Sequence, residues 1–131
     1  MQFDNRAIEE LCRQRHIRLL ILFGSQATGK ATERSDTDVA VLLERPPSWE
    51  EFCLLGEDLE RVLQIRGRLD LVVLNTSSST TLGREIVRSA RILFDCDGER
   101  YAEFSTKAMK AYADFEPFRR LRQAALARSR T

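Results

Sequence analysis

The sequence predicts a mixed α/β domain of the α+β type, with a small mixed sheet flanked by helices and a C-terminal helix or helix pair. Short apolar runs alternate along the chain with longer amphipathic segments, as expected for strands interleaved with helices. The 131 residues, 43% hydrophobic and 31% charged, suit one globular domain. We therefore expect residues 1–131 to form a single domain, with residues from about 98 to 131 as a helical extension.

The first third of the chain predicts one helix and two strands. Good helix formers separate loosely spaced apolar residues over 3–15, which favours a helix. The run IRLLILF at 17–23 is short, branched and apolar, so it predicts a buried strand that Gly24 ends. Residues 25–35 are small and polar and predict a loop with one helical turn at most. DVAVLL at 38–43 predicts the second strand.

The middle of the chain predicts helix, strand, helix and strand in turn. Ser48 and Glu51 form a capping-box pattern for a helix that runs to about residue 64. LDLVVL at 69–74 predicts a third strand, the polar run 75–81 precedes a helix that ends near residue 90, and ILF at 92–94 predicts a short fourth strand. The helix after Ser48 has an apolar face expected to lie in the core, made of Trp49, Phe52, Leu55, Leu59 and Val62.

The C-terminal segment predicts an amphipathic helix or a pair of helices, bent at Pro117. It follows an Asp97-Gly98 turn, and its apolar residues are three or four positions apart: Tyr101, Phe104, Ala108, Ala111, Phe115 and Phe118. Two interpretations stay open for this stripe. It belongs to the core of this chain, or it forms an interface with another protein.

Composition excludes several classes of protein. No apolar stretch approaches the roughly 20 residues that span a membrane, and the N-terminus lacks an apolar signal region, so we expect a cytoplasmic protein. Cys12, Cys53 and Cys96 are far apart and odd in number, which predicts reduced core cysteines and neither disulfides nor a zinc site. His16 is the single histidine and is expected at a helix end or strand entry.

The charge of the chain is uneven. Five arginines, at 119, 120, 122, 128 and 130, follow Glu116 without an acid among them, and removing them from the net charge of +1 leaves residues 1–116 at −4. Such a tail suits a solvated helix face, an acidic partner or nucleic acid. The charge of the whole chain does not support direct nucleic-acid binding, while a contact of the tail with operator DNA is left open.

Two aspartates stand where the second strand begins. Side chains two residues apart on a strand point to one face, with Cα atoms roughly 6.5 Å apart, so Asp36 and Asp38 direct two carboxylates at one place. Two such charges at about 4 Å repel by ~1 kcal/mol in water and ~4 kcal/mol at an effective dielectric constant near 20. A hard divalent cation such as Mg²⁺, which binds carboxylates together with substrate phosphates, would offset this repulsion.

Asp70 interrupts the apolar third strand, where an unpaired buried carboxylate is costly. If that strand lies beside the second one, its carboxylate joins those of Asp36 and Asp38. The alternative is structural: Asp70 pairs with Arg66 or Arg68, and Asp36 only begins a turn.

Gly24-Ser25 ends the first strand. A glycine there permits a tight turn and exposed N–H groups that can bind phosphate, and the serine hydroxyl adds a hydrogen bond. Such pairs are also common in ordinary loops. Gly-Ser followed after ten residues by Asp-x-Asp is rarer, at roughly one chain of this length in 500 at average residue frequencies.

These motifs together resemble the DNA polymerase β-type nucleotidyltransferase superfamily. LFGSQATGKATERSDTDVAVLL, LDLVVLN, RILFD and YADF look like the minimal nucleotidyltransferases (MNT) that act as antitoxins beside HEPN-domain toxins. The resemblance covers nearly the whole chain and implies the nucleotidyltransferase fold. Val73 departs from it, because relatives often carry a second acid at this position of the strand.

The resemblance implies roles for individual residues. Asp36 and Asp38 would hold two Mg²⁺ ions that also bind the nucleotide triphosphate, and Asp70 would complete the metal site and help to activate the attacking hydroxyl. Gly24 and Ser25 would bind the β and γ phosphates. Three further residues match the loop pattern of nucleotide-binding relatives, namely Gly29, Arg34 and Ser35.

The implied activity is Mg²⁺-dependent transfer of AMP from ATP to a tyrosine hydroxyl of a HEPN toxin, a predicted ribonuclease that this chain would neutralise. Two alternatives are an antitoxin that acts by binding alone and an adenylyltransferase of a small molecule such as an antibiotic.

Overall fold

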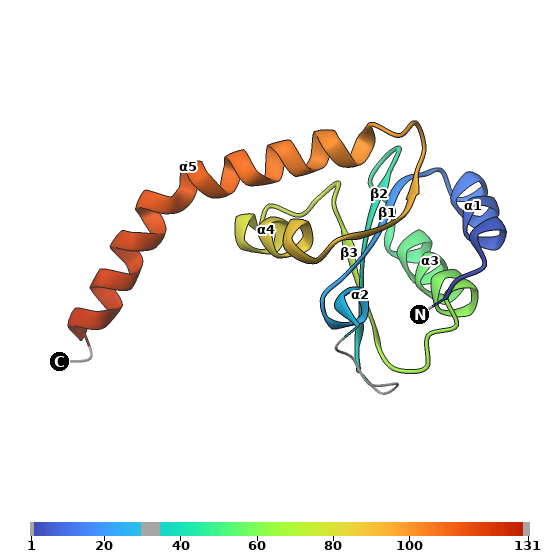
Figure 1. Ribbon diagram of the computed structural model, residues 1–131, viewed down its shortest axis with the longest axis horizontal. Helices are drawn as coiled ribbons and strands as arrows, with labels where there is room; N and C mark the ends of the chain where they lie inside the picture. Colours follow the sequence, from blue (N-terminus) through green and yellow to red (C-terminus); the bar gives the residue numbers. More distant parts are fainter. Residues whose placement is uncertain (1, 30–34, 130–131) are drawn as a thin grey trace.

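The computed structural model describes residues 2–29 and 35–129 and shows a four-stranded sheet between two layers of helices (Figure 1). The predicted mixed α/β class is confirmed, and the expected helical turn after Gly24 is α2. The elements in chain order are α1 (Asn5–Gln14), β1 (Ile17–Phe23), α2 (Ser25–Thr28), β2 (Thr37–Leu43), α3 (Trp49–Val62), β3 (Leu69–Val73), α4 (Thr80–Ser89), β4 (Arg91–Asp95) and α5 (Arg100–Ser129).

The sheet has the strand order β3-β2-β1-β4. β1 is antiparallel to both of its neighbours, whereas β2 and β3 are parallel. A parallel pair needs a crossover connection, and α3 supplies it between β2 and β3. β2 and β3 therefore begin at the same end of the sheet, which is the end where β1 finishes.

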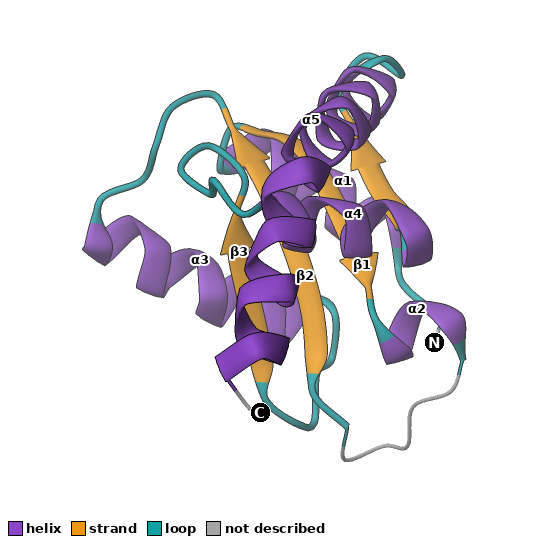
Figure 2. Cartoon of the chain, turned by 90° about the vertical axis from the view of Figure 1, so that its left-hand side faces the viewer, coloured by secondary structure: helices purple, strands orange, loops and turns teal. Residues whose placement is uncertain are grey.

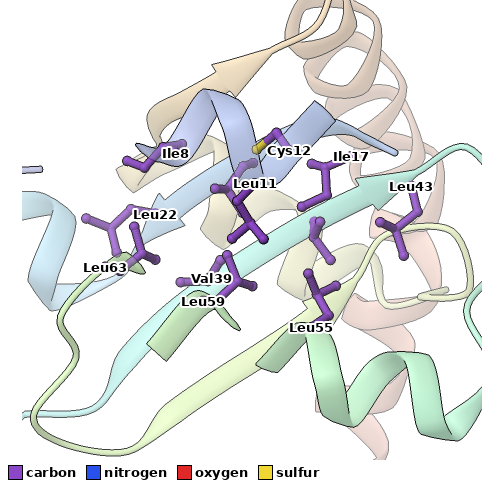
Figure 3. Close-up of a cluster of buried hydrophobic side chains, with 12 residues drawn as sticks. Ile8, Leu11, Cys12, Ile17, Leu22, Val39, Leu43, Leu55, Leu59 and Leu63 are labelled. Atoms are coloured by element: carbon purple, nitrogen blue, oxygen red, sulfur yellow. The ribbon is translucent and has the colours of Figure 1, made fainter. Parts of the chain in front are cut away.

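Both faces of the sheet are covered, which explains why β1 is apolar at nearly every position. Leu20 and Leu22 lie in a cluster with side chains of α1 and α3, part of which Figure 3 shows. Leu19 and Ile21 point to the other face, where they meet Ile86 of α4. Each of these five side chains is fully buried.

α3 begins with the predicted capping box. The Glu51 N–H donates to Ser48 Oγ, and the Ser48 N–H donates to Glu51 Oε1, each at 3.1 Å. The expectation that the whole apolar face lies in the core was wrong at Trp49, which is 77% exposed and stacks on Phe52. Trp49 is the first residue of the helix, and the residues that reach the core cluster, such as Leu55, lie one or more turns later.

α5 is one helix of 30 residues with Pro117 inside it. Its first turns lie against the α4 side of the sheet, where Tyr101 and Phe104 pack on the second core cluster. Figure 1 shows the rest of α5 extending away from the sheet. The start of the helix is fixed by Asp95, whose carboxylate accepts hydrogen bonds from the N–H groups of Gly98 (3.0 Å) and Tyr101 (2.9 Å).

The cysteines and the single histidine test the remaining expectations about the fold. Cys12 is buried, and burial raises the pKa of its thiol to about 12. Cys53 and Cys96 are exposed, so placing them in the core was wrong; all three are free thiols. His16 lies between α1 and β1, as expected. Within the ranges given above, none of the helices combines the length and apolarity that crossing a bilayer requires.

Candidate active site

The acidic site lies at the end of the sheet where β2 and β3 begin. In the ladder between these strands Asp38 stands directly opposite Asp70, and on its other side Asp38 pairs with Phe23 of β1. Side chains alternate along a strand: Val39 belongs to the cluster that faces α1 and α3, so Asp38 points to the face covered by α4. Asp36, two residues earlier, is exposed just before the strand.

The carboxylates interact electrostatically. Burial raises the pKa of Asp38 above its usual range, and the negative charges of Asp70, Asp36 and Glu85 raise it further. The sequence predicted the convergence of the three aspartates if the two strands were neighbours, and the ladder shows that they are. The repulsion is thus a property of the folded chain, because Asp70 reaches Asp38 only through the parallel pairing.

Asp70 also has a cationic neighbour. Arg68 Nε lies 3.2 Å from Asp70 Oδ1, which is one of the two pairings that the structural interpretation proposed. The Arg68 side chain is 77% exposed and that of Asp70 is 37% exposed. Surface ion pairs of this kind contribute about 0–1 kcal/mol, so this contact is weak enough to yield to a more highly charged ligand.

Gly24 connects the end of β1 to the acids. Its φ of 75° and ψ of −152° lie in a region that essentially only glycine occupies. A Cβ at this position would lie 2.5 Å from Asp38 Oδ2. Glycine is therefore required both by the backbone conformation and by the close approach of the Asp38 carboxylate.

The other residues expected to bind the nucleotide lie around α2, which Figure 2 shows beyond the end of β1. Ser25 is the first residue of α2 and is exposed. Gly29 ends the helix in the left-handed conformation, with its N–H bonded to the Ser25 carbonyl. The Ser35 carbonyl accepts a hydrogen bond of 3.3 Å from Gln26 Nε2, which ties α2 to the segment before β2. Arg34 lies outside the described residues.

α4 contributes two residues that sequence reasoning missed. Ser89 Oγ accepts a hydrogen bond of 2.9 Å from the Gly24 N–H, and Glu85 is the third acid whose charge raises the pKa of Asp38. Ser89 lies 65 residues from Gly24 in the sequence. No motif marks it, since a serine at the end of a helix has no distinctive pattern.

Oxygen donors dominate the site, and this set suits a hard cation such as Mg²⁺. In the part of the chain that the structure describes, only Asp95, Cys96 and Asp97 place their ligand atoms all within 4.8 Å of one another. The aspartates at 36, 38 and 70 are more widely spread. That spread is expected of carboxylates that repel one another while Arg68 draws Asp70 aside.

Comparison with known proteins places these features in a family. The family described as polymerase beta, nucleotidyltransferase matches residues 5–99, which include all four strands. The protein adenylyltransferase MntA of Thermococcus cleftensis is 38% identical over 82 residues, which are 60% of this chain and 81% of that protein.

Two solved structures extend the likeness to almost the full length of this chain. One chain of a toxin-antitoxin crystal structure with AMP-PNP is 25% identical, with a TM-score of 0.72 and coverage of 98% of this chain and 99% of that one. A tri-AMPylated Shewanella oneidensis HEPN toxin in complex with MNT antitoxin contains a chain of the same fold, 23% identical, with a TM-score of 0.67 and coverage of 97% and 96%.

Alanine at Gly24 should be far more destabilising than alanine at Gly29. Both glycines have positive φ, but nothing lies within 4 Å of a Cβ at Gly29, whereas the Cβ at Gly24 meets Asp38. We expect Gly29→Ala to lower the free energy of unfolding by about 1 kcal/mol and Gly24→Ala by about 2–4 kcal/mol. Urea unfolding measures both. Adding Asp38→Ala should recover part of the Gly24→Ala loss, and strict additivity of the two changes would contradict the proposed contact.

Asparagine at Asp38 should stabilise the metal-free protein at neutral pH. The pKa of Asp38 is raised in the folded state, so the native protein holds this proton more tightly than the unfolded chain. The free energy of unfolding then falls as the pH rises from the unfolded pKa, about 3.9, through the raised folded value. Asp38→Asn removes this effect. In urea titrations with EDTA, the free energy of unfolding of Asp38→Asn should exceed that of the wild type at pH 7, and the difference should shrink toward pH 4. A difference that does not depend on pH would contradict this account.

Proposed function

The chain belongs to the polymerase beta nucleotidyltransferase family, and we propose that it transfers AMP from ATP to a tyrosine hydroxyl of a HEPN-domain toxin, for which it is the antitoxin. The observation that carries the proposal is the ladder position of Asp38, opposite Asp70 and against Gly24. It brings the acids and the glycine turn to one end of the sheet. The MntA relative, an adenylyltransferase of proteins, and the toxin-antitoxin complex with AMP-PNP support the choice of nucleotide and acceptor.

We assign the metal site to Asp36, Asp38 and Asp70. Their oxygens are the donors that Mg²⁺ prefers. Burial first, and then the negative charges of Asp70, Asp36 and Glu85, raise the pKa of Asp38, and a bound cation would offset both effects. Two Mg²⁺ ions, when bound, would neutralise charge on the triphosphate and on the departing pyrophosphate.

The other residues of the site would position the triphosphate and the attacking hydroxyl. Ser25 would bind the β and γ phosphates, and Gly24, whose own N–H is bonded to Ser89 Oγ, would permit their close approach. Gly29, Arg34 and Ser35, which match the loop pattern of the family, are proposed to bind the same nucleotide. The tyrosine oxygen would then attack the α-phosphorus as the bond to the β-phosphate oxygen breaks and pyrophosphate leaves. Asp70 would accept the hydroxyl proton, because its carboxylate stands beside Asp38 and is partly exposed to an incoming acceptor.

The last half of α5 offers a surface for the toxin. Residues 113–118 and 120–129 are exposed, and they carry four large apolar side chains that are 42–68% exposed: Phe115, Phe118, Leu121 and Leu126. The family match ends at residue 99, yet the AMP-PNP toxin-antitoxin chain covers 98% of this chain. α5 is therefore shared with a chain that functions beside a toxin. Of the two interpretations of the apolar stripe, burial within this chain holds for its first turns and an interface is proposed for its last.

Removing the acids should abolish transfer without unfolding the chain. We expect the Asp36→Asn, Asp38→Asn double variant to lose at least about 10²-fold in rate, because it removes carboxylates that would hold the metal ions, whose positive charge stabilises the transition state. Mass spectrometry of a HEPN-domain partner incubated with ATP and Mg²⁺ measures the added AMP. A Glu57→Gln, Glu60→Gln variant, which neutralises two exposed acids on α3, should transfer at the wild-type rate.

AMP addition by the double variant at the wild-type rate would overturn the catalytic assignment. Neutralisation of the toxin without any AMP addition, by wild type and variant alike, would instead identify an antitoxin that acts by binding. Transfer of AMP only to the hydroxyl of a small molecule would identify an adenylyltransferase of small molecules such as antibiotics.

Charge introduced into the α5 surface should weaken the complex and leave the chain folded. Phe118→Glu or Leu121→Glu is expected to reduce affinity for the HEPN-domain partner by about tenfold or more, since buried interface anchors typically contribute over 1 kcal/mol. These side chains are 62% and 68% exposed, so the free energy of unfolding should change little. Gln14→Glu, at an exposed position of α1, adds the same charge outside this surface and provides the control. Isothermal titration calorimetry makes the comparison, and equal affinities for all three variants would exclude this surface.

A further inference from the structure

Ser89 connects α4 to the glycine turn, because its hydroxyl makes one hydrogen bond within the helix and one to Gly24. It is the last residue of α4, and its hydroxyl donates to the Glu85 carbonyl at 3.1 Å while accepting from the Gly24 N–H at 2.9 Å. A serine hydroxyl has one proton to donate. The bond to Glu85 uses that proton, which leaves the oxygen lone pairs oriented toward Gly24.

The hydrogen bond from Ser89 to the Glu85 carbonyl is common in helices, whereas the one from the Gly24 N–H to Ser89 is not. Serine hydroxyls within helices commonly donate to a carbonyl one turn earlier, as Ser105 does to Ala102 at 3.1 Å. Ser89 alone among the serines discussed here also binds a backbone amide from a distant element. A structural role within α4 would need only the bond to Glu85.

Gly24 is the place where a small displacement would matter most. The Asp38 carboxylate lies against its Cα, and its carbonyl accepts the Thr28 N–H at 3.3 Å as α2 begins. A rotation of the Gly24 peptide would therefore move Ser25 and the carboxylate contact together.

We propose that Ser89 is a positioning residue for nucleotide binding. Its hydroxyl fixes the Gly24 peptide so that the Gly24-Ser25 turn is preorganised to receive the triphosphate beside Asp38. The inference rests on the proposed nucleotidyl transfer, but it concerns a residue on α4 that contacts neither nucleotide nor metal in that proposal. Preorganisation of a binding turn lowers the cost of ordering it when the ligand arrives.

Three variants separate positioning from a structural effect. Ser89→Ala deletes the hydroxyl, and Ser89→Thr keeps it. Ser105→Ala deletes a helix hydroxyl that donates to the Ala102 carbonyl of its own helix. With a HEPN-domain partner and Mg²⁺, Ser89→Ala should raise the KM for ATP about 3- to 10-fold, the effect of one net hydrogen bond, and leave kcat within about twofold. Ser89→Thr should recover most of the affinity, and Ser105→Ala should match the wild type.

Two further measurements do not depend on catalysis. Hydrogen exchange of the Gly24 amide, followed by NMR on the full chain, should be faster in Ser89→Ala than in wild type and Ser105→Ala. The Kd for Mg²⁺-AMP-PNP should rise by the same factor as the KM. A wild type that binds AMP-PNP but modifies no partner would refute the proposed acceptor while leaving this test intact.

Faster exchange at Gly24 with unchanged KM and Kd would overturn the inference, because the hydrogen bond would then serve the fold alone. A fall in kcat without a change in KM would also overturn it. So would a failure of Ser89→Thr to restore affinity.

Discussion

The main constraint on this structure is that three aspartates of like charge lie near one another at one end of the sheet. Asp36, Asp38 and Asp70 converge at one end of the sheet, where burial and mutual repulsion oppose the ionisation of Asp38. An isolated hairpin could relieve such repulsion by splaying its strands. Here β2 lies between β1 and β3 and is covered by helices on both faces, so the strand cannot move without disrupting the core.

The helices of the two faces have different relations to this site. α1 and α3 cover the face opposite the Asp38 side chain. α4 lies on the face of the acids, and its last turn reaches Gly24 through Ser89. α4 also packs closely on α5: a Cβ on Gly83 would lie 3.3 Å from the Ala108 Cβ, and Arg84 stacks on Tyr112. α4 thus contacts both the glycine turn and the long C-terminal helix.

Much of the fold was predictable from local pattern. IRLLILF is short and rich in branched residues, which favours a strand buried on both faces over a helix. Ser48 with Glu51 marks the start of α3 through capping chemistry alone. The predictions of burial were wrong where a side chain fits the local pattern but lies away from the core in the folded chain. Trp49 continues the spacing of its helix, and Cys53 is small and apolar, yet neither reaches the core.

Part of the candidate site was also predictable from the sequence, and part of it was not. The acids and the Gly-Ser pair were recognisable because strands disfavour aspartate and because a resemblance supplied their spacing. The sequence did not show that β3 lies beside β2, because neither strand carries a local signal that identifies its neighbour. The position of Asp70 beside Asp38 was therefore predicted only for the case in which the two strands pair. Ser89 was beyond prediction, because its role depends on a hydrogen bond across 65 residues of sequence.

The length of α5 has a consequence for how an acceptor is chosen. A helix of 30 residues is about 45 Å long, and its last half extends away from the sheet. A protein held along this helix would present its hydroxyl at an effective concentration that can reach the millimolar range for a short tether. Under the proposed function, selectivity would then come from tethering, and the end of the sheet that carries the acids could remain open to any side chain presented to it.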